Sequence, residues 1–335
     1  IVSLFTLIAF IFQAGLFFTP AFAELACWND AALASVVGGS DAPTGALRGN
    51  PNPQASQKVA DPVNLATGNY YYEHTDITLP LRGQPLEFKR YYNSQDDYEG
   101  PFGIGTSHSY NIFLIEAAEE GVSYVIRRNP DGNKDKFTKT ASGAYTPPLG
   151  IFDSLVKTAQ GYVITTKHGI AYEFNPSGWL SSITGRNQNR VILTYDAVPG
   201  VLTKIADTQD RGITLEYGPQ KKISAIKDFT GRAWKYEYSN NDLIAVTTPA
   251  TGDYPSGLTT TYSYNNHNLT SITDPKGNTY LNIIYDSQDR VDKMTYGLYD
   301  YDFNYSKSLT TVYDRSGSRI DYQLNGDGTT KKKKE

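Results

Sequence analysis

The chain has 335 residues, of which 26 are tyrosine and one is cysteine, and its formal net charge is −4. Charged residues make up 20% of the chain and apolar residues 39%, a mixture that argues against collagen, a coiled coil and a polytopic membrane protein. The acidic balance also lacks the electrostatic footprint of a nucleic-acid-binding protein.

The chain begins with an uncharged apolar segment, residues 1–23 (IVSLFTLIAFIFQAGLFFTPAFA). Pro20 followed by an A-x-A end at Ala23 predicts a Sec-type signal peptide, although the first residue is Ile1 and no basic n-region precedes the apolar core. An uncleaved anchor is the alternative, because the stretch nearly reaches the length of a membrane-spanning helix. Either form predicts a secreted or cell-surface protein that meets the membrane only through this leader.

Residues 24–57 are rich in Ala, Gly, Ser, Pro and Asn and contain few large apolar side chains. Such a segment buries too little surface to offset its ordering entropy, so we expect a flexible linker. The single cysteine, Cys27, lies here and excludes an intramolecular disulfide or a cysteine-cluster metal site. We interpret it as an unremarkable residue. Lipidation is the alternative, although Glu24 stands where a lipobox needs an apolar residue.

From residue 58 onward the chain predicts an all-β fold. No stretch keeps helical apolar spacing for more than about two turns, and short alternating runs bounded by turn residues dominate. Residues 123–128 and 136–138 flank an NPDG turn and predict a hairpin. Residues 161–166 and 170–174 predict a second hairpin around KHG.

From Trp179 a repeat appears, in which each unit ends on a tyrosine. Bulky residues stand two and four positions before each closing tyrosine, which places them on one face of a strand. Each of the first five units also begins with an apolar pair three residues apart, and a polar turn follows. We therefore predict strand–turn–strand units over residues 179–328 that stack into a continuous curved antiparallel sheet. The closing tyrosines are Tyr195, Tyr217, Tyr238, Tyr264, Tyr285, Tyr305 and Tyr322.

Residues 231–238 (GRAWKYEY) and the pair Tyr285-Asp286 resemble the YD repeats of the rearrangement-hotspot (RHS) family. Residues 61–70 (DPVNLATGNY), 79–88 (LPLRGQPLEF) and 90–94 (RYYNS) resemble the domain of unknown function that precedes those repeats. On this resemblance, residues 58–178 are assigned to an RHS-associated N-terminal domain. The family usually has a Trp shortly before the HSY of residues 108–110, and this chain has GTS there instead.

The resemblance implies a hollow β shell that encloses a variable C-terminal toxin, as in insecticidal toxin complexes, with a related shell in the teneurin receptors. The D-P-x-G-L segment at which complete members cleave themselves is absent, and residues 274–278 (DPKGN) occupy an ordinary repeat turn. About seven units are too few for a closed shell, so we expect a fragment of a larger protein. The lysine-rich end, residues 329–335, is interpreted as the product of a cut or shifted reading frame, with a solvated tail or polybasic patch as alternatives.

We predict no catalytic, cofactor-binding or metal-binding residues. His74, His108, His168 and His267 lack metal-ligand spacing and are interpreted as surface or turn residues. The GTSHS of residues 105–109 is interpreted as a structural loop, and the DGNKD of residues 131–135 as a hairpin turn instead of a calcium loop. The tyrosine stripe is interpreted as packing, with a glycan or peptide platform as the alternative.

The leading functional hypothesis is a non-enzymatic, exported shell or scaffold whose partner is its own C-terminal region or toxin cargo. An adhesion or carbohydrate-binding module, with a cell-surface glycan or protein as partner, is the alternative. A third hypothesis is a β-solenoid hydrolase working with scattered carboxylates. No cofactor and no nucleic-acid partner is expected.

Overall fold

The computed structural model describes residues 58–59, 63–81, 85–196, 201–218, 220–326 and 328–335. All regular structure in these residues is β, which confirms the all-β prediction. The predicted signal peptide (1–23), the linker (24–57) and Cys27 lie outside the described residues.

Four small antiparallel sheets come first in the chain. They are the pair β1 (Lys58–Val59) and β2 (Val63–Asn64); the three-stranded sheet of β3 (Tyr71–Leu79), β4 (Leu86–Asn93) and β7 (Thr106–His108); the pair β5 (Glu99–Gly100) and β6 (Gly103–Ile104); and the meander of β8 (Phe113–Glu119), β9 (Val122–Arg128), β10 (Lys134–Lys139) and β11 (Tyr145–Thr146). The β9–β10 connection confirms the predicted hairpin around the NPDG turn.

The remaining chain forms one 18-stranded sheet in which the strand order is the sequence order. Its strands are β12 (Ser154–Thr158), β13 (Gly161–Thr165), β14 (Ala171–Phe174), β15 (Leu180–Thr184), β16 (Arg190–Tyr195), β17 (Leu202–Asp207), β18 (Gly212–Tyr217), β19 (Ile223–Asp228), β20 (Ala233–Ser239), β21 (Asp242–Thr247), β22 (Thr259–Asn265), β23 (Asn268–Thr273), β24 (Thr279–Tyr285), β25 (Val291–Tyr296), β26 (Tyr299–Ser306), β27 (Leu309–Asp314), β28 (Arg319–Leu324) and β29 (Thr330–Lys334). The hairpins from β15–β16 to β27–β28 are the predicted strand–turn–strand units.

A β-bulge explains why apolar residues three apart both open a unit. Where β16 meets β17, the register shifts so that Tyr195 pairs with Leu202 and Thr194 pairs with Lys204. The extra residue shifts the alternation by one, so Leu202 and Ile205 both face the core and are 4% and 0% exposed. The same shift recurs beside the closing tyrosine of the next four units.

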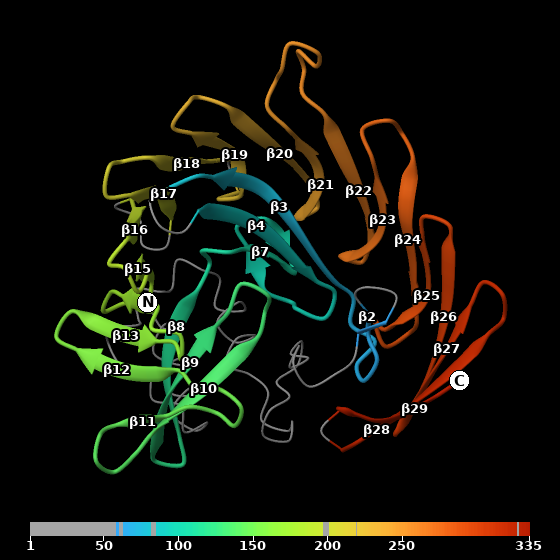
Figure 1. Cartoon of the computed structure of the whole chain (residues 1–335), viewed down its shortest axis with the longest axis horizontal. Coiled ribbons are helices and arrows are strands. Elements are labelled where there is room, and N and C mark those ends of the chain that lie inside the picture. The colour runs from blue at the N-terminus through green and yellow to red at the C-terminus, as the bar shows by residue number, and fades with distance from the viewer. Residues whose placement is uncertain (1–57, 60–62, 82–84, 197–200, 219, 327) are drawn as a thin grey trace, which may run out of the picture.

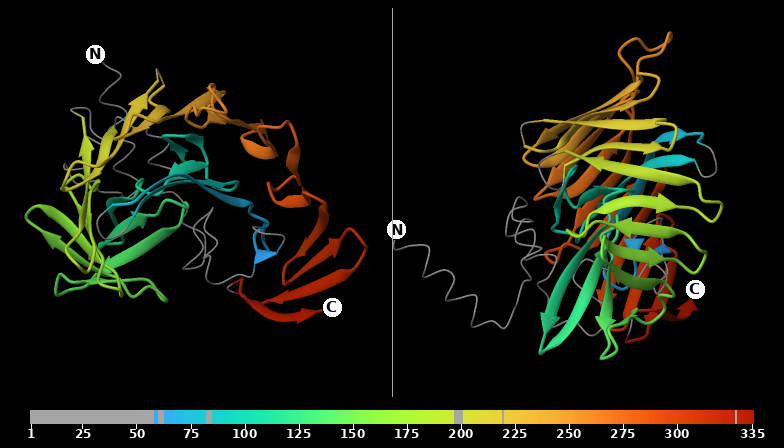
Figure 2. Two further views of the ribbon diagram at one scale, coloured as in Figure 1. Left: turned by 45° about the horizontal axis from the view of Figure 1, so that its top comes forward. Right: turned by 90° about the vertical axis from the view of Figure 1, so that its left-hand side faces the viewer.

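The large sheet bends into an arc, and β3, β4 and β7 lie on its concave side (Figures 1 and 2). One hydrophobic core runs from Val63 to Tyr322 and joins both parts of the chain. The residues two positions before the closing tyrosines face this core, and all but one are buried. The buried ones are Leu193, Leu215, Tyr236, Tyr262, Ile283 and Phe303.

The large sheet extends across the boundary assigned between residues 178 and 179, because β12–β14 precede Trp179 in it. Two other features differ from the sequence-based expectations. The GTSHS segment is not a loop, since its central residues form β7. The lysine run lies in β29 and pairs with β28, so the structure places it in a final strand and not in a tail.

Candidate functional site: the seam between the first strands and the repeats

The N-terminal strands β3 and β4 pack against the concave face of the repeat sheet, and we call this interface the seam. An ion pair lies buried in it. Arg90 donates from Nε to Asp76 Oδ2 at 2.6 Å and from Nη2 to Asp76 Oδ1 at 2.9 Å. The two side chains are 4% and 1% exposed. The β3–β4 register shifts between Thr75 and Ile77, which makes Asp76 the extra residue of a bulge and turns its carboxylate toward Arg90.

Two repeat tyrosines connect this pair to the large sheet. Tyr236 on β20 donates its hydroxyl to Asp76 Oδ2 at 2.9 Å. Tyr262 on β22 accepts from Arg90 Nη2 at 3.1 Å, and the guanidinium carbon lies 5.5 Å from the centroid of its ring. His74 Nδ1 reaches Asp76 Oδ1 at 2.9 Å from the solvent side. A single charge pair therefore links the N-terminal strands to two successive repeat units.

The electrostatics keep both partners ionised. Burial raises the pKa of Asp76, but the Arg90 guanidinium and the hydrogen bond with His74 together outweigh it and hold that pKa below its usual value. Burial likewise opposes the charge on Arg90, and the Asp76 carboxylate raises the Arg90 pKa well above its ordinary value. A pair that stays charged at neutral pH has no proton to exchange, so this arrangement joins elements and is not suited to acid–base catalysis.

In three repeat units, the backbone of the opening residue forms two hydrogen bonds at the seam. Its N–H donates to the N-terminal part of the chain, and its carbonyl accepts from the closing tyrosine. Ile223 donates its backbone N–H to the carbonyl of Pro101 at 2.9 Å. Its own carbonyl accepts the hydroxyl of the closing tyrosine, Tyr238, at 2.6 Å. The same arrangement recurs at Leu269 (N–H to Tyr92 Oη, 2.9 Å; carbonyl from Tyr285, 3.1 Å) and at Val291 (N–H to Gly68 carbonyl, 2.9 Å; carbonyl from Tyr305, 2.8 Å).

Each of the seven predicted repeat tyrosines lies in or beside the large sheet, and five of them make the same contact. Five donate their hydroxyl to the carbonyl of the residue that opens the same unit: Tyr195 to Leu180, Tyr217 to Leu202, Tyr238 to Ile223, Tyr285 to Leu269 and Tyr305 to Val291. Tyr264 packs its ring at right angles to that of Tyr92, with centroids 6.1 Å apart. Tyr322 is 2% exposed. These contacts are packing and hydrogen bonding within the sheet and across the seam.

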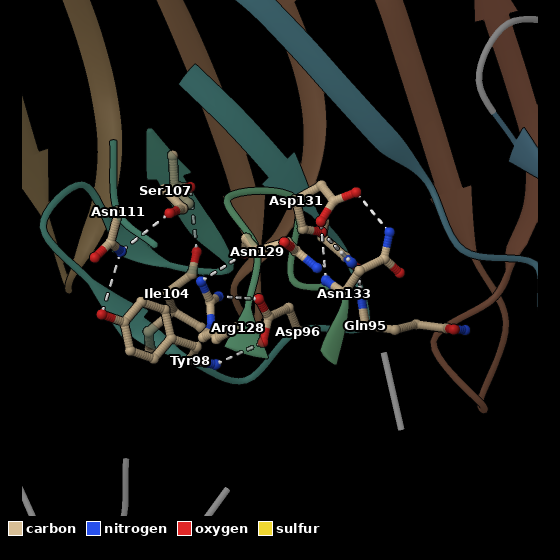
Figure 3. A network of polar contacts seen from close by, with 12 residues as sticks. Gln95, Asp96, Tyr98, Ile104, Ser107, Asn111, Arg128, Asn129, Asp131 and Asn133 are labelled. Atoms are coloured by element: carbon tan, nitrogen blue, oxygen red, sulfur yellow. Dashed lines mark hydrogen bonds and ion pairs between the residues drawn. The ribbon is translucent and has the colours of Figure 1, made fainter. Parts of the chain in front are cut away.

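A second polar network stabilises the N-terminal strands (Figure 3). Arg128 is fully buried and donates to Asp96 Oδ2 at 2.5 Å. Its guanidinium carbon lies 3.8 Å from the centroid of the Tyr98 ring. The Asn111 amide donates to Tyr98 Oη at 3.3 Å and to Ser107 Oγ at 3.0 Å. The Asp96 carboxylate is thus committed to an ion pair and does not form an acid–base pair with its neighbour Asp97.

The prediction that all four histidines are surface or turn residues is wrong for His108, which lies in β7. This residue is 2% exposed and stacks on Phe88 with ring centroids 4.9 Å apart. Burial lowers the pKa of His108 to about 3, so it is neutral in the core. His74, His168 and His267 are exposed, as predicted.

Across the ranges that the structure describes, no three His, Cys, Asp or Glu side chains are grouped to hold a metal ion. The same ranges contain no helix that is long and apolar enough to span a bilayer.

The sequence interpretation missed the charged residues of the seam, although β4 carries a signal for one of them. Leu86, Phe88, Arg90 and Tyr92 alternate along this strand and are all buried. A charged residue in phase with core positions indicates a buried ion pair. Lys222, which binds Glu99 Oε1 at 2.8 Å, shows no comparable signal, because it precedes its strand.

Two family models match the chain. One is described as a domain of unknown function (DUF6531) and matches residues 60–137, where the N-terminal strands begin. The other is the RHS repeat, which matches residues 251–279 across β22 and β23.

The chain is similar to the tRNA nuclease WapA of Bacillus subtilis (strain 168), with 31% identity over 135 residues. It is also similar to the tRNA3(Ser)-specific nuclease WapA of Bacillus spizizenii, at the same identity and length. The matched stretch is 40% of this chain and 6% of each of these relatives.

Among solved structures, the crystal structure of TcdB2-TccC3-Cdc42 aligns with a TM-score of 0.35 at 14% identity, covering 80% of this chain and 18% of that one. The crystal structure of TcdB2-TccC3 aligns with a TM-score of 0.34 at 14% identity, covering 80% of this chain and 19% of that one. From the two family matches and the motifs that predict them, the chain carries an RHS repeat with a DUF6531 domain N-terminal to it.

Proposed function

We propose that this chain is a non-catalytic wall of a larger shell that encloses or presents a C-terminal effector. One observation carries the proposal: the 18-stranded sheet, in sequence order, curves around the N-terminal strands and shares one core with them. A curved sheet of repeated hairpins can be extended by adding further units at its edge. The presence of an RHS repeat supports the same role.

Protease protection in the full product of the reading frame tests this proposal. The region after residue 335 should resist a protease in the full-length protein and become sensitive when it is expressed alone. Equal sensitivity in both forms, or a reading frame without further repeats, would count against a shell.

The non-catalytic part of the proposal can be tested directly on this chain. The relatives are named as tRNA nucleases, but the matched stretch is only 6% of their length. We expect purified chain to leave tRNA intact, with and without divalent cations. Cleavage that persists through further purification would assign an activity to the chain itself.

We further propose that the protein is secreted or exposed at the cell surface, because its first 23 residues have the pattern of a signal peptide. Mass spectrometry of the exported protein should find Glu24 as its first residue. Recovery of residues 1–23 on the exported protein would instead support the anchored form.

A second candidate function, glycan binding, is favoured by one exposed aromatic cluster at the β25–β26 turn. Tyr296, Leu298 and Tyr299 are 50%, 79% and 65% exposed, and the rings of Tyr280 and Tyr296 meet at 86°. Exposed tyrosine faces can stack on the apolar faces of sugars while their hydroxyls stay hydrated. A glycan array with wild type and Tyr299→Ala tests this function, and equal signals from both proteins would exclude the cluster as the site.

A further inference from the structure

A pocket of about 340 Å³ opens where the hairpin turns of β13–β14 and β15–β16 approach the end of β3. This volume lies within the range of small-molecule sites. The pocket is separate from the Asp76–Arg90 seam, and none of the residues that line it takes part in the seam contacts described above.

The inner surface of the pocket is apolar. Ile183 on β15 and Val191 on β16 are directly paired across the two strands. Ile170, just before β14, and Leu81, after β3, complete this surface. All four side chains are only partly buried, so they present apolar area that a ligand can cover.

The rim of the pocket is cationic. Arg186 and Arg190 both line it, together with the exposed His168. The one acidic residue in the lining, Asp207, is already neutralised, because both of its oxygens accept hydrogen bonds from Arg211. No acidic side chain in the lining is therefore left to attract a cation.

The two arginines differ in their availability to a ligand. Arg190 forms an ion pair with Glu173. Arg186 is exposed on the β15–β16 turn, and no ion pair or hydrogen bond joins its side chain to another residue in the described part of the chain. A guanidinium without a partner presents its paired N–H donors in the geometry that a carboxylate accepts.

We propose that this pocket binds a small amphipathic carboxylate, with its apolar group against Ile170, Ile183 and Val191 and its carboxylate on Arg186. The site does not depend on the shell function, because it is complete within residues 81–207 of this chain. A peptide C-terminus with an apolar side chain and a free aliphatic acid share this chemistry.

Methyl NMR on the full chain tests the proposal. The probes are N-acetyl-leucine, which mimics a peptide end, octanoate, which is a free aliphatic acid, and the uncharged N-acetyl-leucine amide. We expect at least one acid to shift the methyl signals of Ile170, Ile183 and Val191, with a dissociation constant on the order of 1 mM or lower. The stronger of the two acids identifies the source, and the amide should bind roughly tenfold more weakly than its acid.

Matched arginine variants then test the contact. Arg186→Gln should weaken binding of the acid by roughly fivefold or more, because it removes the charged guanidinium and keeps a polar side chain at the same position. Arg315→Gln, at the exposed turn of β27–β28, should leave the affinity unchanged. Equal loss in both variants, equal binding of acid and amide, or no shift of the pocket methyls with either acid would overturn the proposal.

Discussion

At the scale of single residues, the seam depends on charges that have been removed from water. Burying two ions costs several kcal/mol each, and their attraction offsets this only when geometry and additional hydrogen bonds are favourable. Asp76 meets this condition. Arg90 donates to both carboxylate oxygens, Tyr236 donates to Oδ2, and His74 contacts Oδ1. The pair therefore contributes modestly as a whole, while the loss of one member is costly.

Asp76→Asn should lower the free energy of unfolding by about 3–5 kcal/mol, because it leaves the Arg90 charge buried without a carboxylate. Urea denaturation followed by circular dichroism measures the change. Asp302→Asn is the matched control, since it removes one partner of the exposed Lys293–Asp302 pair. Losses of similar size in both variants would show that the seam pair has no special role.

His108 should make the protein sensitive to mild acid. Its pKa in the folded state is about 3, below the ordinary value of 6.5, so the unfolded chain takes up the proton first. Proton uptake by the unfolded chain lowers the free energy of unfolding. This loss is absent above pH 6.5 and grows by about 1.4 kcal/mol for each pH unit below it.

The free energy of unfolding should therefore fall by about 2 kcal/mol between pH 7 and pH 5 through this residue alone. His108→Phe, which keeps a ring against Phe88, should remove most of that fall. His168→Asn, at an exposed turn, should retain it. An unchanged pH dependence in the His108 variant would refute the assignment.

At the scale of elements, the repeat unit is a hairpin whose two ends are tied together by its closing tyrosine. The hydroxyl satisfies the carbonyl of the opening residue, which lies beside a bulge. A bulge disrupts the regular ladder of backbone hydrogen bonds, so a side-chain donor is needed there. This explains why tyrosine, and not phenylalanine, ends the five units in which this bond forms.

Tyr238→Phe should cost about 1 kcal/mol of unfolding free energy, because it keeps the ring and removes the bond to the Ile223 carbonyl. Thermal and urea unfolding of the variant measure this loss. Tyr299→Phe, on a tyrosine that is 65% exposed, should be neutral. A neutral Tyr238 variant would mean that water replaces the hydroxyl at no cost.

At the scale of the whole molecule, the N-terminal strands and the repeats share one continuous hydrophobic core. The small sheets fill the concave side of the arc, and backbone contacts join them to several repeat units. One of these contacts is very close: Gly103 has a φ of 103°, and a Cβ there would lie 2.2 Å from the Asn241 carbonyl oxygen. Only glycine fits this position.

Gly103→Ala should push β6 away from the start of β21 and break the Ile104 N–H to Asn241 carbonyl bond. Hydrogen exchange should then increase in β6 and at the β20–β21 turn. Gly297→Ala is the control, because its φ is also positive but its Cβ would meet nothing within 4 Å. Equal changes at both sites would indicate backbone strain alone and not a lost contact.

The local pattern predicts much of this fold, and its limits have physical causes. Period-two alternation and turn residues predict the hairpins and place Leu215 and Tyr236 in the core, because both signals act within a few residues. The unit boundaries follow from the spacing of the tyrosines. The contact between Asp76 and Tyr236 does not follow, because the two residues are 160 positions apart. The burial of His108 does not follow either, because it depends on the pairing of β4 with β7, which no local rule predicts. The bulges themselves are visible only as apolar pairs three residues apart.

The sequence-ordered sheet also has a consequence for synthesis on the ribosome. When a new hairpin is synthesised, the strand with which it pairs has already been synthesised, because strand order follows sequence order. The strands that fill the concave side are also translated before any repeat. The small sheets formed by β2 to β11 can therefore act as a template against which later units pack one after another, without waiting for a distant partner. Growth from one end keeps the β12 edge fixed and exposes only one new strand edge at a time, which limits the exposure of unpaired strands to neighbouring chains.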